Sequence, residues 1–307
     1  MSDILQRILR QIGCEDLPDR LAGLPGADLN TLTLEVFGAR AAKSDAPAIV
    51  KTHAGSRFTQ PSALDPVRYH LLESELLALA AGQGIAPVLL SPVAPLGSCS
   101  AFGCVHQNKV ISAARGVEVL ADPTNMLALI IASRLKGGGI GEDETAHLCA
   151  TARVTRAQQF SGRHSFAHFG IFSIVSRGKD TGSYACEQAL LTGQLDYYRA
   201  LTEEKYSGNL SITLRRREGY PDAEGFFDRM SVFVRSRLPG IPLAIESDHA
   251  DNGYYKGLNF KLYLHTREGE QIEIGDGGFV DWLQKANGSK KERCLISGIG
   301  LDRLMMI

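Results

Sequence analysis

The chain has 307 residues, of which 44% are hydrophobic and 22% are charged, and a formal net charge of -1 at pH 7. This length and apolar content suffice for one large domain or two modest ones with a buried core. The near-neutral charge gives no overall basic field, which argues against a nucleic-acid-binding protein. No run of 18 apolar residues occurs, so we expect no membrane-spanning helix.

Cysteine usage predicts a reducing, cytoplasmic setting. The six cysteines form no C-x-x-C pair, which argues against a structural zinc site and for free thiols. Cys99, Cys104 and His106 are close in sequence, but no second pair of ligands follows at zinc-site spacing. We therefore predict no metal site built by the protein alone. The N-terminus is amphipathic and has no apolar core of a signal peptide.

Residues 1–60 are predicted to form an N-terminal extension, followed by one main domain over 61–307. Residues 3–13 have the apolar spacing of a short helix. Leu32–Phe37 alternates apolar and polar side chains, which predicts a strand, and residues 41–58 are interpreted as a hairpin arm.

Two helices are predicted in the first half of the main domain. Residues 67–81 have apolar side chains at helical spacing and are followed by Gly82. A buried helix over about 125–136 ends at "GGGIG" (137–141), which lacks the Lys-Ser/Thr of a phosphate-binding loop and is interpreted as a helix stop. Between them, three prolines in 85–97 indicate an edge or interface strand, because proline cannot donate to a strand ladder.

Strands dominate the remainder, with one helix predicted over residues 184–201. They are mostly connected as hairpins, and we expect the helices to lie on one face. This pattern predicts an α+β fold with an antiparallel sheet flanked by helices, and not a doubly wound parallel sheet. The predicted strands are 147–158, 167–178, 209–216, 258–266, 271–278 and a terminal strand from Cys294 that leads into a Gly-x-Gly turn and a last helix.

Four stretches, in this order, resemble the catalytic core of class II aminoacyl-tRNA synthetases, closest to the histidyl type. Residues 67–97 are similar to motif 1, which forms the homodimer interface in that family. "VLADPTNMLAL" (119–129) resembles the loop and helix that close over the amino acid, and places Thr124 there. "ARVTRAQQFSGRHSFAHFG" (152–170) resembles motif 2, and "SGIGLDRLMMI" (297–307) resembles motif 3. The resemblance covers about residues 60–307 and implies binding of ATP and Mg²⁺.

Two arginines are the candidate catalytic residues. By resemblance, Arg156 binds the α-phosphate and Arg303 the γ-phosphate of ATP. Their chemistry agrees, because converging guanidinium groups make bidentate, charge-assisted bonds to a polyphosphate and keep their charge. Gly298 and Gly300 let the backbone approach the nucleotide closely.

Three further residues of the motif 2 segment are candidate ATP ligands. Gln158 stands where the family has a glutamate, and it can still accept a bond from the amino group of adenine. Arg163 is predicted on the loop, where it either reaches the β- and γ-phosphates or is an exposed arginine. Phe166 is either the stacking face for adenine or a core aromatic.

"YYKGLNFKLYL" (254–264) and "GDGGFVDWL" (275–283) resemble the substrate-binding strands of the histidyl family. Many polar residues of those family strands are replaced in this chain. His168 replaces a glutamine, and Phe172 stands where a glutamate meets the imidazole. A buried imidazole without partners costs about 1–3 kcal/mol per missing bond, which disfavours histidine as substrate. The candidate substrate-binding residues are Thr124, His168, Lys256, Asn259, Lys261, Gly277 and Gly278.

Lys256 and Lys261 predict a pocket for an anionic group, unless they lie on a solvated strand face. The first functional hypothesis is a stand-alone enzyme that activates an amino acid or other carboxylate with ATP and passes it to a small acceptor. The second is a non-catalytic regulatory subunit of ATP phosphoribosyltransferase, which is similar to the histidyl core and senses histidine. A tRNA synthetase is the third, disfavoured because we expect no anticodon-binding domain and a near-neutral chain has little to hold tRNA phosphates.

The motif 1 resemblance predicts a homodimer. Pro87, Pro92 and Pro95 mark an apolar edge strand that a twofold interface would cover. Light scattering at micromolar concentration is expected to give about twice the chain mass of 33.2 kDa. A single species near the chain mass would contradict this prediction.

Overall fold

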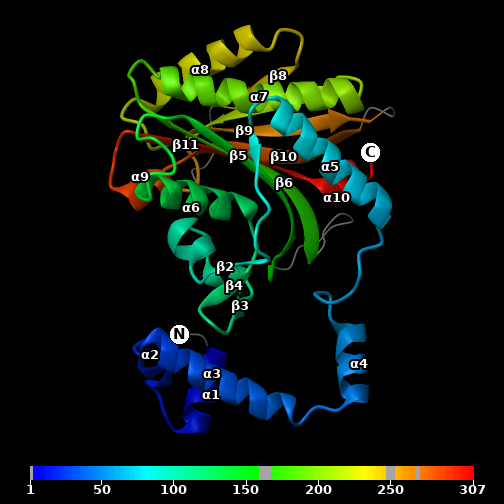
Figure 1. Ribbon diagram of the computed structural model, residues 1–307, viewed down its shortest axis with the longest axis vertical. Coiled ribbons are helices and arrows are strands. Elements are labelled where there is room, and N and C mark those ends of the chain that lie inside the picture. The colour runs from blue at the N-terminus through cyan, green and yellow to red at the C-terminus, as the bar shows by residue number, and fades with distance from the viewer. Residues whose placement is uncertain (1–2, 159–166, 247–252, 267–269) are drawn as a thin grey trace.

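The computed structural model describes residues 3–158, 167–246, 253–266 and 270–307. Within these residues a large sheet runs through the molecule with helices on both faces (Figure 1). The helices are α1 (Asp3–Ile12), α2 (Leu17–Ala22), α3 (Gly26–Ala41), α4 (Ala46–Gly55), α5 (Pro66–Gly82), α6 (Pro123–Lys136), α7 (Ala185–Lys205), α8 (Ala223–Arg237), α9 (Trp282–Asn287) and α10 (Leu301–Leu304). None of these helices is long and apolar enough to cross a membrane.

The strands form one large and one small sheet. The strands are β1 (Ala86–Pro87), β2 (Val93–Pro95), β3 (Ser112–Ala113), β4 (Val117–Val119), β5 (Ala146–Thr155), β6 (His168–Lys179), β7 (Leu210–Arg216), β8 (Leu243–Glu246), β9 (Lys256–His265), β10 (Gln271–Val280) and β11 (Glu292–Gly300). In the described part of the chain the large sheet has the order β1-β5-β6-β11-β10-β9-β7-β8, and the small sheet β2-β4-β3. The large sheet is antiparallel from β5 to β7, whereas its two edge pairs, β1 with β5 and β7 with β8, are parallel.

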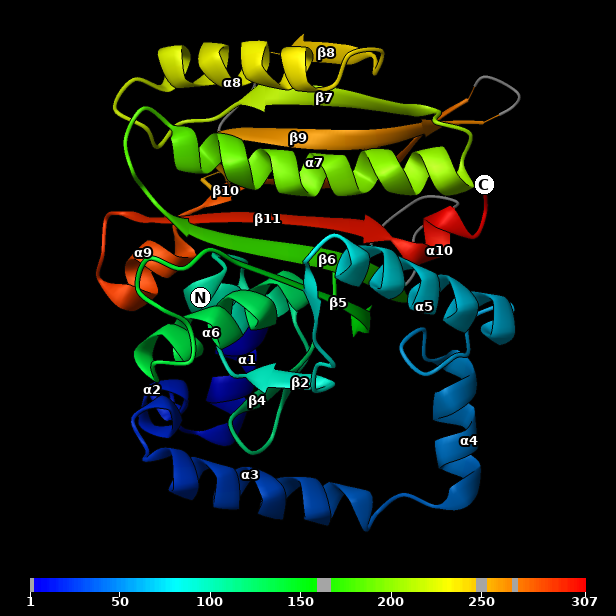
Figure 2. The same ribbon diagram turned by 45° about the horizontal axis from the view of Figure 1, so that its top comes forward.

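This architecture confirms the predicted α+β fold, but the expectation that the helices lie on one face is wrong. Side chains alternate along β6: Phe172 and Ile174 pack in the core with α7, while Val175 packs with Leu127 of α6. Helices α5, α7 and α8 therefore cover one face, and α6 and α9 cover part of the other (Figure 2). The uncovered part of that second face is where the candidate site lies.

Helices α5 and α6 begin and end within about two residues of their predicted bounds. The carboxylate of Asp65 accepts from Val67 N at 2.8 Å and caps α5, and that of Asp122 accepts from Thr124 N at 2.9 Å and caps α6. Such caps satisfy main-chain N–H groups that have no partner within the helix. The "GGGIG" segment follows α6 and stops it, as expected.

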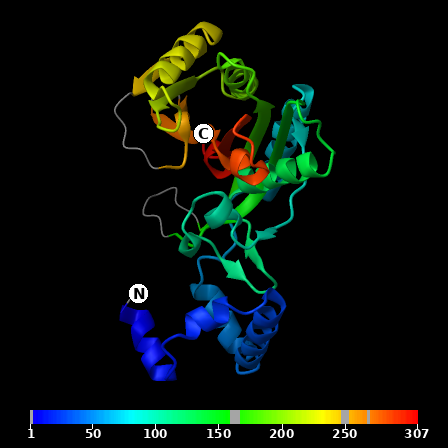
Figure 3. The same cartoon turned by 90° about the vertical axis from the view of Figure 1, so that its left-hand side faces the viewer.

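The N-terminal extension contradicts the sequence prediction. The segments interpreted as a strand (Leu32–Phe37) and a hairpin (41–58) are the helices α3 and α4. A helix satisfies its own backbone hydrogen bonds, whereas a strand needs a neighbour, and these helices lie away from the large sheet (Figure 3). Asp45, which accepts from Ala48 N at 2.8 Å, is the capping signal that the interpretation missed.

Two further segments differ from expectation. The proline-bearing segment 85–97 is not one strand: Ala86–Pro87 pairs with the large sheet and Val93–Pro95 with the small one. The predicted turn at Gly298–Gly300 is the end of β11, which stays paired with β6 as far as Gly300. Helix α8 and strand β8 have no counterpart in the sequence prediction.

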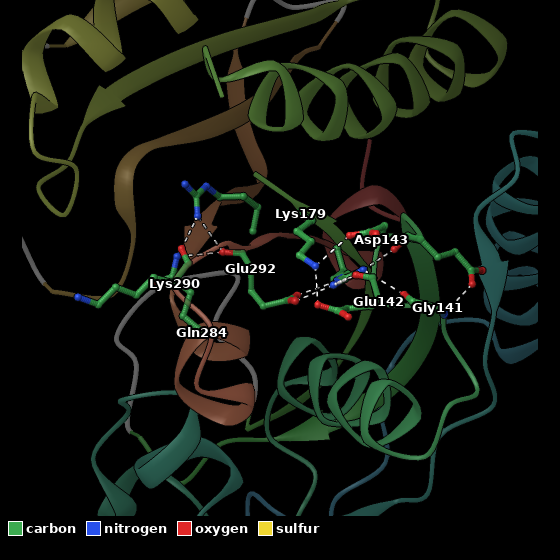
Figure 4. A network of polar contacts seen from close by, with 10 residues as sticks. Gly141, Glu142, Asp143, Lys179, Gln284, Lys290 and Glu292 are labelled. Atoms are coloured by element: carbon green, nitrogen blue, oxygen red, sulfur yellow. Dashed lines mark hydrogen bonds and ion pairs between the residues drawn. The ribbon is translucent and has the colours of Figure 1, made fainter. Parts of the chain in front are cut away.

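A buried ion pair joins the adjacent strands β6 and β11 of the large sheet. Arg177 of β6 is fully buried, and its guanidinium binds both carboxylate oxygens of Glu292 of β11, at 2.6 and 2.7 Å. The same guanidinium donates to the carbonyls of Glu142 and Glu144, at 2.7 and 2.5 Å. Figure 4 shows Glu292 close to the 141–143 segment, which these bonds hold against the sheet.

Replacing Arg177 by alanine is expected to lower the free energy of unfolding by about 3–5 kcal/mol, because Glu292 would keep a buried and uncompensated charge. Lys179→Ala is the control, since Lys179 binds the largely exposed Glu142 and Asp143, and such pairs contribute about 0–1 kcal/mol. Urea unfolding measures both variants. Equal losses in the two variants would show that the buried ion pair contributes no more to the free energy of unfolding than the exposed one.

Candidate functional site

A cavity of about 290 Å³ lies beside the first turn of α6, against strands β6, β10 and β11. Helix α10 and the pair Tyr254–Tyr255, which precedes β9, complete its wall. The wall contains four carboxylates and two guanidinium groups, so acidic side chains outnumber basic ones. The charged residues are Asp122, Glu273, Asp276, Asp302, Arg156 and Arg303.

Arg156, the residue directly after β5, lines the cavity. Its Nε donates to the carbonyl of Ala121 at 3.1 Å, and its guanidinium lies 5.2 Å from the ring centre of Phe169. Asp122 is 3.8 Å away. A guanidinium has five N–H donors, and the bond to Ala121 fixes its direction while using one of them.

Arg303 lines the cavity from α10. Its terminal nitrogen donates to the carbonyl of Glu273 at 2.7 Å. The helix itself is fixed by Asp302, whose buried carboxylate accepts from Gly170 N at 2.7 Å and lies 3.5 Å from Arg153. Two arginines separated by almost half the sequence thus line one cavity.

Three strands contribute to the floor of the cavity in register. Asp276 of β10 is paired with Gly298 of β11, and Gly298 is paired with Ser173 of β6. All three line the cavity. The hydroxyl of Tyr255 donates to Asp276 at 3.1 Å. Burial raises the pKa of Asp276, while the bond from Tyr255 acts in the opposite direction.

Five of the sequence-predicted site residues line this cavity: Thr124, Arg156, Gly298, Gly300 and Arg303. Gln158 does not line the cavity, and its main-chain carbonyl accepts from Arg57 at 3.4 Å. Arg163 and Phe166 lie outside the described residues, so their predicted roles stay predictions.

The two lysines predicted to hold an anionic group have partners within the chain, and the hydrogen bond of Lys256 goes to the carbonyl of Gly253 at 3.2 Å. Lys261 donates to Glu273 at 2.5 Å, and Lys256 lies 3.9 Å from Asp281. Neither lines the cavity. The anion pocket at these lysines therefore stays a prediction, and the charged side chains of β10 that line the cavity are the carboxylates Glu273 and Asp276.

The other four predicted substrate ligands also lie off the cavity wall. His168 contacts Arg153 at 2.9 Å and the carbonyl of Gln60 at 2.6 Å. Asn259 is buried and accepts from Arg217 at 2.7 Å. Gly277 and Gly278 are packing positions, because a Cβ atom would come within 2.6 Å of Ile296 O at Gly277 and of the Tyr255 ring at Gly278.

The positions used to exclude histidine do not face the cavity. Phe172 is fully buried and stacks on Tyr197 of α7 at 5.0 Å, on the other face of the sheet, and Phe260 packs in the same core. Sequence analysis missed Asp276 and Ser173, which do face the cavity. The available signal was Asp276 itself, a carboxylate among glycines inside a predicted strand.

The residues present do not form a metal site by themselves. Among the described residues, no group of three or more His, Cys, Asp and Glu side chains is placed to hold a metal ion. Cys99 is buried and Cys104 is exposed, and both are free thiols. The prediction of no protein-built metal site stays a prediction for the whole chain.

Comparison with solved structures identifies the fold. The chain is similar to an apo histidyl-tRNA synthetase from S. aureus, with a TM-score of 0.59, 12% identity, and coverage of 82% of this chain and 68% of that one. It is also similar to a putative threonyl-tRNA synthetase from Aeropyrum pernix, with a TM-score of 0.60, 13% identity, and coverage of 78% and 58%. The chain thus has the fold of a class II aminoacyl-tRNA synthetase catalytic core.

A third similar structure is described as an ATP phosphoribosyltransferase regulatory subunit/histidyl-tRNA synthetase from Bacillus halodurans C. The TM-score is 0.56 at 12% identity, and the match covers 81% of each chain. No protein-family model and no curated protein matches the chain. Identities this low establish the fold alone, and the resemblance to the histidyl type expected from the motifs is confirmed at that level.

Asp302→Ala is expected to lower the free energy of unfolding by about 1–3 kcal/mol, because the buried N–H of Gly170 loses its acceptor. Asp302→Asn is the matched control, since its amide oxygen can still accept that bond, and should cost less. Urea unfolding compares the two. An asparagine variant as unstable as the alanine variant would show that the charge, and not the hydrogen bond, holds α10.

Proposed function

We propose that this protein is an ATP-dependent, AMP-forming ligase that activates an amino acid or other carboxylic acid and transfers it to a small acceptor. One observation carries the proposal: Arg156 and Arg303, on separate elements, line the same cavity together with Gly298 and Gly300. The motif resemblance assigned these two arginines to the α-phosphate and the γ-phosphate of ATP.

The residues present fit a nucleotide. The two guanidinium groups offer charged, directional donors to phosphate oxygens, and the glycines leave the backbone of β11 open to a flat or charged ligand. Because no described cluster of three or more ligands exists, Mg²⁺ would be held chiefly by phosphate oxygens and water, with at most one or two carboxylates of the wall.

The chemistry requires no protein nucleophile. A carboxylate oxygen of the substrate attacks the α-phosphorus of ATP and pyrophosphate leaves; the acceptor then attacks the carbonyl carbon and AMP leaves. Arg156 and Arg303 would hold the phosphates in line and stabilise the developing charge, which are positioning and electrostatic contributions. ATP supplies the leaving group, and the chain supplies the alignment.

A non-catalytic regulatory protein is the second candidate. It is favoured by the similarity to the structure described as a regulatory subunit, which matches 81% of each chain. The cavity also contains acceptors, Asp276 among them, that the sequence argument against histidine did not consider. This candidate predicts that the protein binds histidine and releases no pyrophosphate from ATP. The third candidate function is tRNA aminoacylation.

A homodimer is part of the proposal. Val67 and Leu71 on α5 are 68% and 58% exposed, and Leu89 after β1 is 98% exposed. These apolar side chains belong to the segment that resembles motif 1, and a twofold interface would cover them.

Arg156→Ala and Arg303→Ala are each expected to weaken binding of ATP with Mg²⁺ about ten- to hundredfold, because each removes a charged hydrogen-bonding group. Titration calorimetry measures the affinity. Arg235→Ala is the control, since Arg235 is exposed on α8, away from the cavity.

Pyrophosphate release with ATP, Mg²⁺ and a panel of amino and carboxylic acids tests the reaction itself. ATP binding that depends on both arginines, with pyrophosphate release for some acid, supports the ligase. Histidine binding with no pyrophosphate release for any acid favours the regulatory candidate, and an absence of ATP binding removes the main support for the ligase.

A further inference from the structure

Residues 57–60, called the bridging segment below, contact both strands of the pair β5–β6. The guanidinium of Arg57 donates to the carbonyl of Ala157 at 2.6 Å, just beyond the end of β5. The carbonyl of Gln60 lies 2.6 Å from Nε2 of His168, the first residue of β6. The chain that returns from α4 to α5 (Figure 1) therefore bridges two neighbouring strands at one end of the pair.

Both ring nitrogens of His168 have partners, which fixes the ring and the position of its proton. An arginine side chain has donors only, so Nε of Arg153, at 2.9 Å, donates to Nδ1 of His168. The ring proton is then on Nε2, which donates to the carbonyl of Gln60. Arg153 also lies 3.5 Å from Asp302, whose carboxylate fixes α10. One end of the bridging segment is thus connected to the helix that carries Arg303.

Arg156 directly precedes the residue that Arg57 binds. The main-chain N–H of Arg156 donates to the carbonyl of Ala167 at 2.9 Å, and that of Ala157 donates to the carbonyl of Lys109 at 3.0 Å. The remaining main-chain group of Ala157, its carbonyl, accepts from Arg57, an exposed residue of the N-terminal extension. Because the direction of a side chain depends on its backbone, Arg57 contributes to where the Arg156 guanidinium lies.

The bridging segment is itself attached to the end of α4. The hydroxyl of Thr59 and Nδ1 of His53 are 3.2 Å apart, and the side-chain amide of Gln60 donates to the carbonyl of His53. The guanidinium of Arg57 lies 4.3 Å from the ring centre of Phe58, a cation–π contact that restricts it further. Arg57 is therefore presented by a hydrogen-bonded turn.

We propose that Arg57 is a positioning residue of the cavity: by binding the carbonyls of Ala157 and Gln158 it fixes Arg156, so that the N-terminal extension is part of the phosphate-binding site. The role of Arg156 toward phosphate rests on the proposed function. Arg57 is not among the residues that line the cavity and acts through the backbone. A guanidinium suits this task, because its planar fork can donate to two neighbouring carbonyls at once.

The experiment measures the affinity of the full chain for ATP with Mg²⁺ by titration calorimetry, in a double-mutant cycle of Arg57→Ala and Arg156→Ala. Arg57→Lys is the conservative variant, because an ammonium group keeps donors for the carbonyl of Ala157. Arg40→Ala is the matched control, since Arg40 is an exposed arginine of α3 in the same extension. Hydrogen exchange of the Arg156 and Ala157 amides, followed by mass spectrometry, reports on the backbone without any ligand.

Arg57→Ala is expected to weaken ATP binding about five- to tenfold, because Arg156 loses part of its fixed direction. In the Arg156→Ala background the same change should weaken binding by less than about twofold, since the residue through which Arg57 acts is absent. Arg57→Lys should recover most of the affinity, and Arg40→Ala should leave it unchanged. Exchange at Arg156 and Ala157 should be faster in Arg57→Ala than in the wild type, while circular dichroism and melting temperature establish that each variant is folded.

The outcomes separate this inference from the proposed function. Wild-type ATP binding that Arg57→Ala leaves unchanged, or weakens equally with and without Arg156, overturns the positioning role, while the ATP binding still supports the ligase. If the wild type binds no ATP, the ligase loses its main support, and the same cycle with inorganic pyrophosphate decides the positioning role. Binding of neither ligand, or hydrogen exchange that Arg57→Ala does not change, also overturns that role.

Discussion

The contact between Arg177 and Glu292 fixes the register of the two strands on which the rest of the site depends. It joins the adjacent strands β6 and β11, with both charges buried and both carboxylate oxygens engaged. Because side chains alternate with a period of two, a slip of one residue would turn every side chain of one strand to the other face. Ser173 and Gly298 would then no longer face the same cavity. The register of this pair thus has chemical as well as structural consequences.

The cavity wall carries both kinds of charge, with Asp122 lying 3.8 Å from Arg156 and Asp302 adjacent in sequence to Arg303. The guanidinium groups come from elements at the ends of strands, where the backbone leaves the sheet, whereas Asp276 belongs to the interior of β10. Lys261 and Glu273 bind each other on neighbouring strands, so the lysine that seemed available in the sequence is already neutralised. The cavity therefore keeps its two guanidinium groups close to carboxylates, and a ligand phosphate would compete with Asp122 for Arg156.

Sequence reasoning succeeded where local signals decide the structure. The helical spacing of apolar side chains in α5 and the glycines that follow α5 and α6 act within a few residues, so these elements were predictable. The arginines of the candidate site were found because the motif resemblance supplied their context. The predicted fold class depended on the order of these elements alone.

Sequence reasoning failed where the secondary structure, or the direction of a side chain, depends on partners distant in sequence. Leu32–Phe37 alternates like a strand, yet it pairs with no strand in the described part of the chain and is part of α3. Which side chains of β9, β10 and β11 face the cavity depends on register and on the irregular pairing near Glu273 and Gly278. A one-residue offset decides between Asp276 and Gly277, and no local pattern determines that offset.

The N-terminal helices have a consequence for the behaviour of the protein in solution. Helices α2, α3 and α4 bury no residue, and apolar side chains such as Val36, Phe37 and Val50 are at least half exposed. With a formal net charge of -1, copies of the chain repel one another only weakly at neutral pH. Colloidal behaviour is therefore governed by the apolar surface of this extension, and added salt, which screens charge, should change it little compared with dilution.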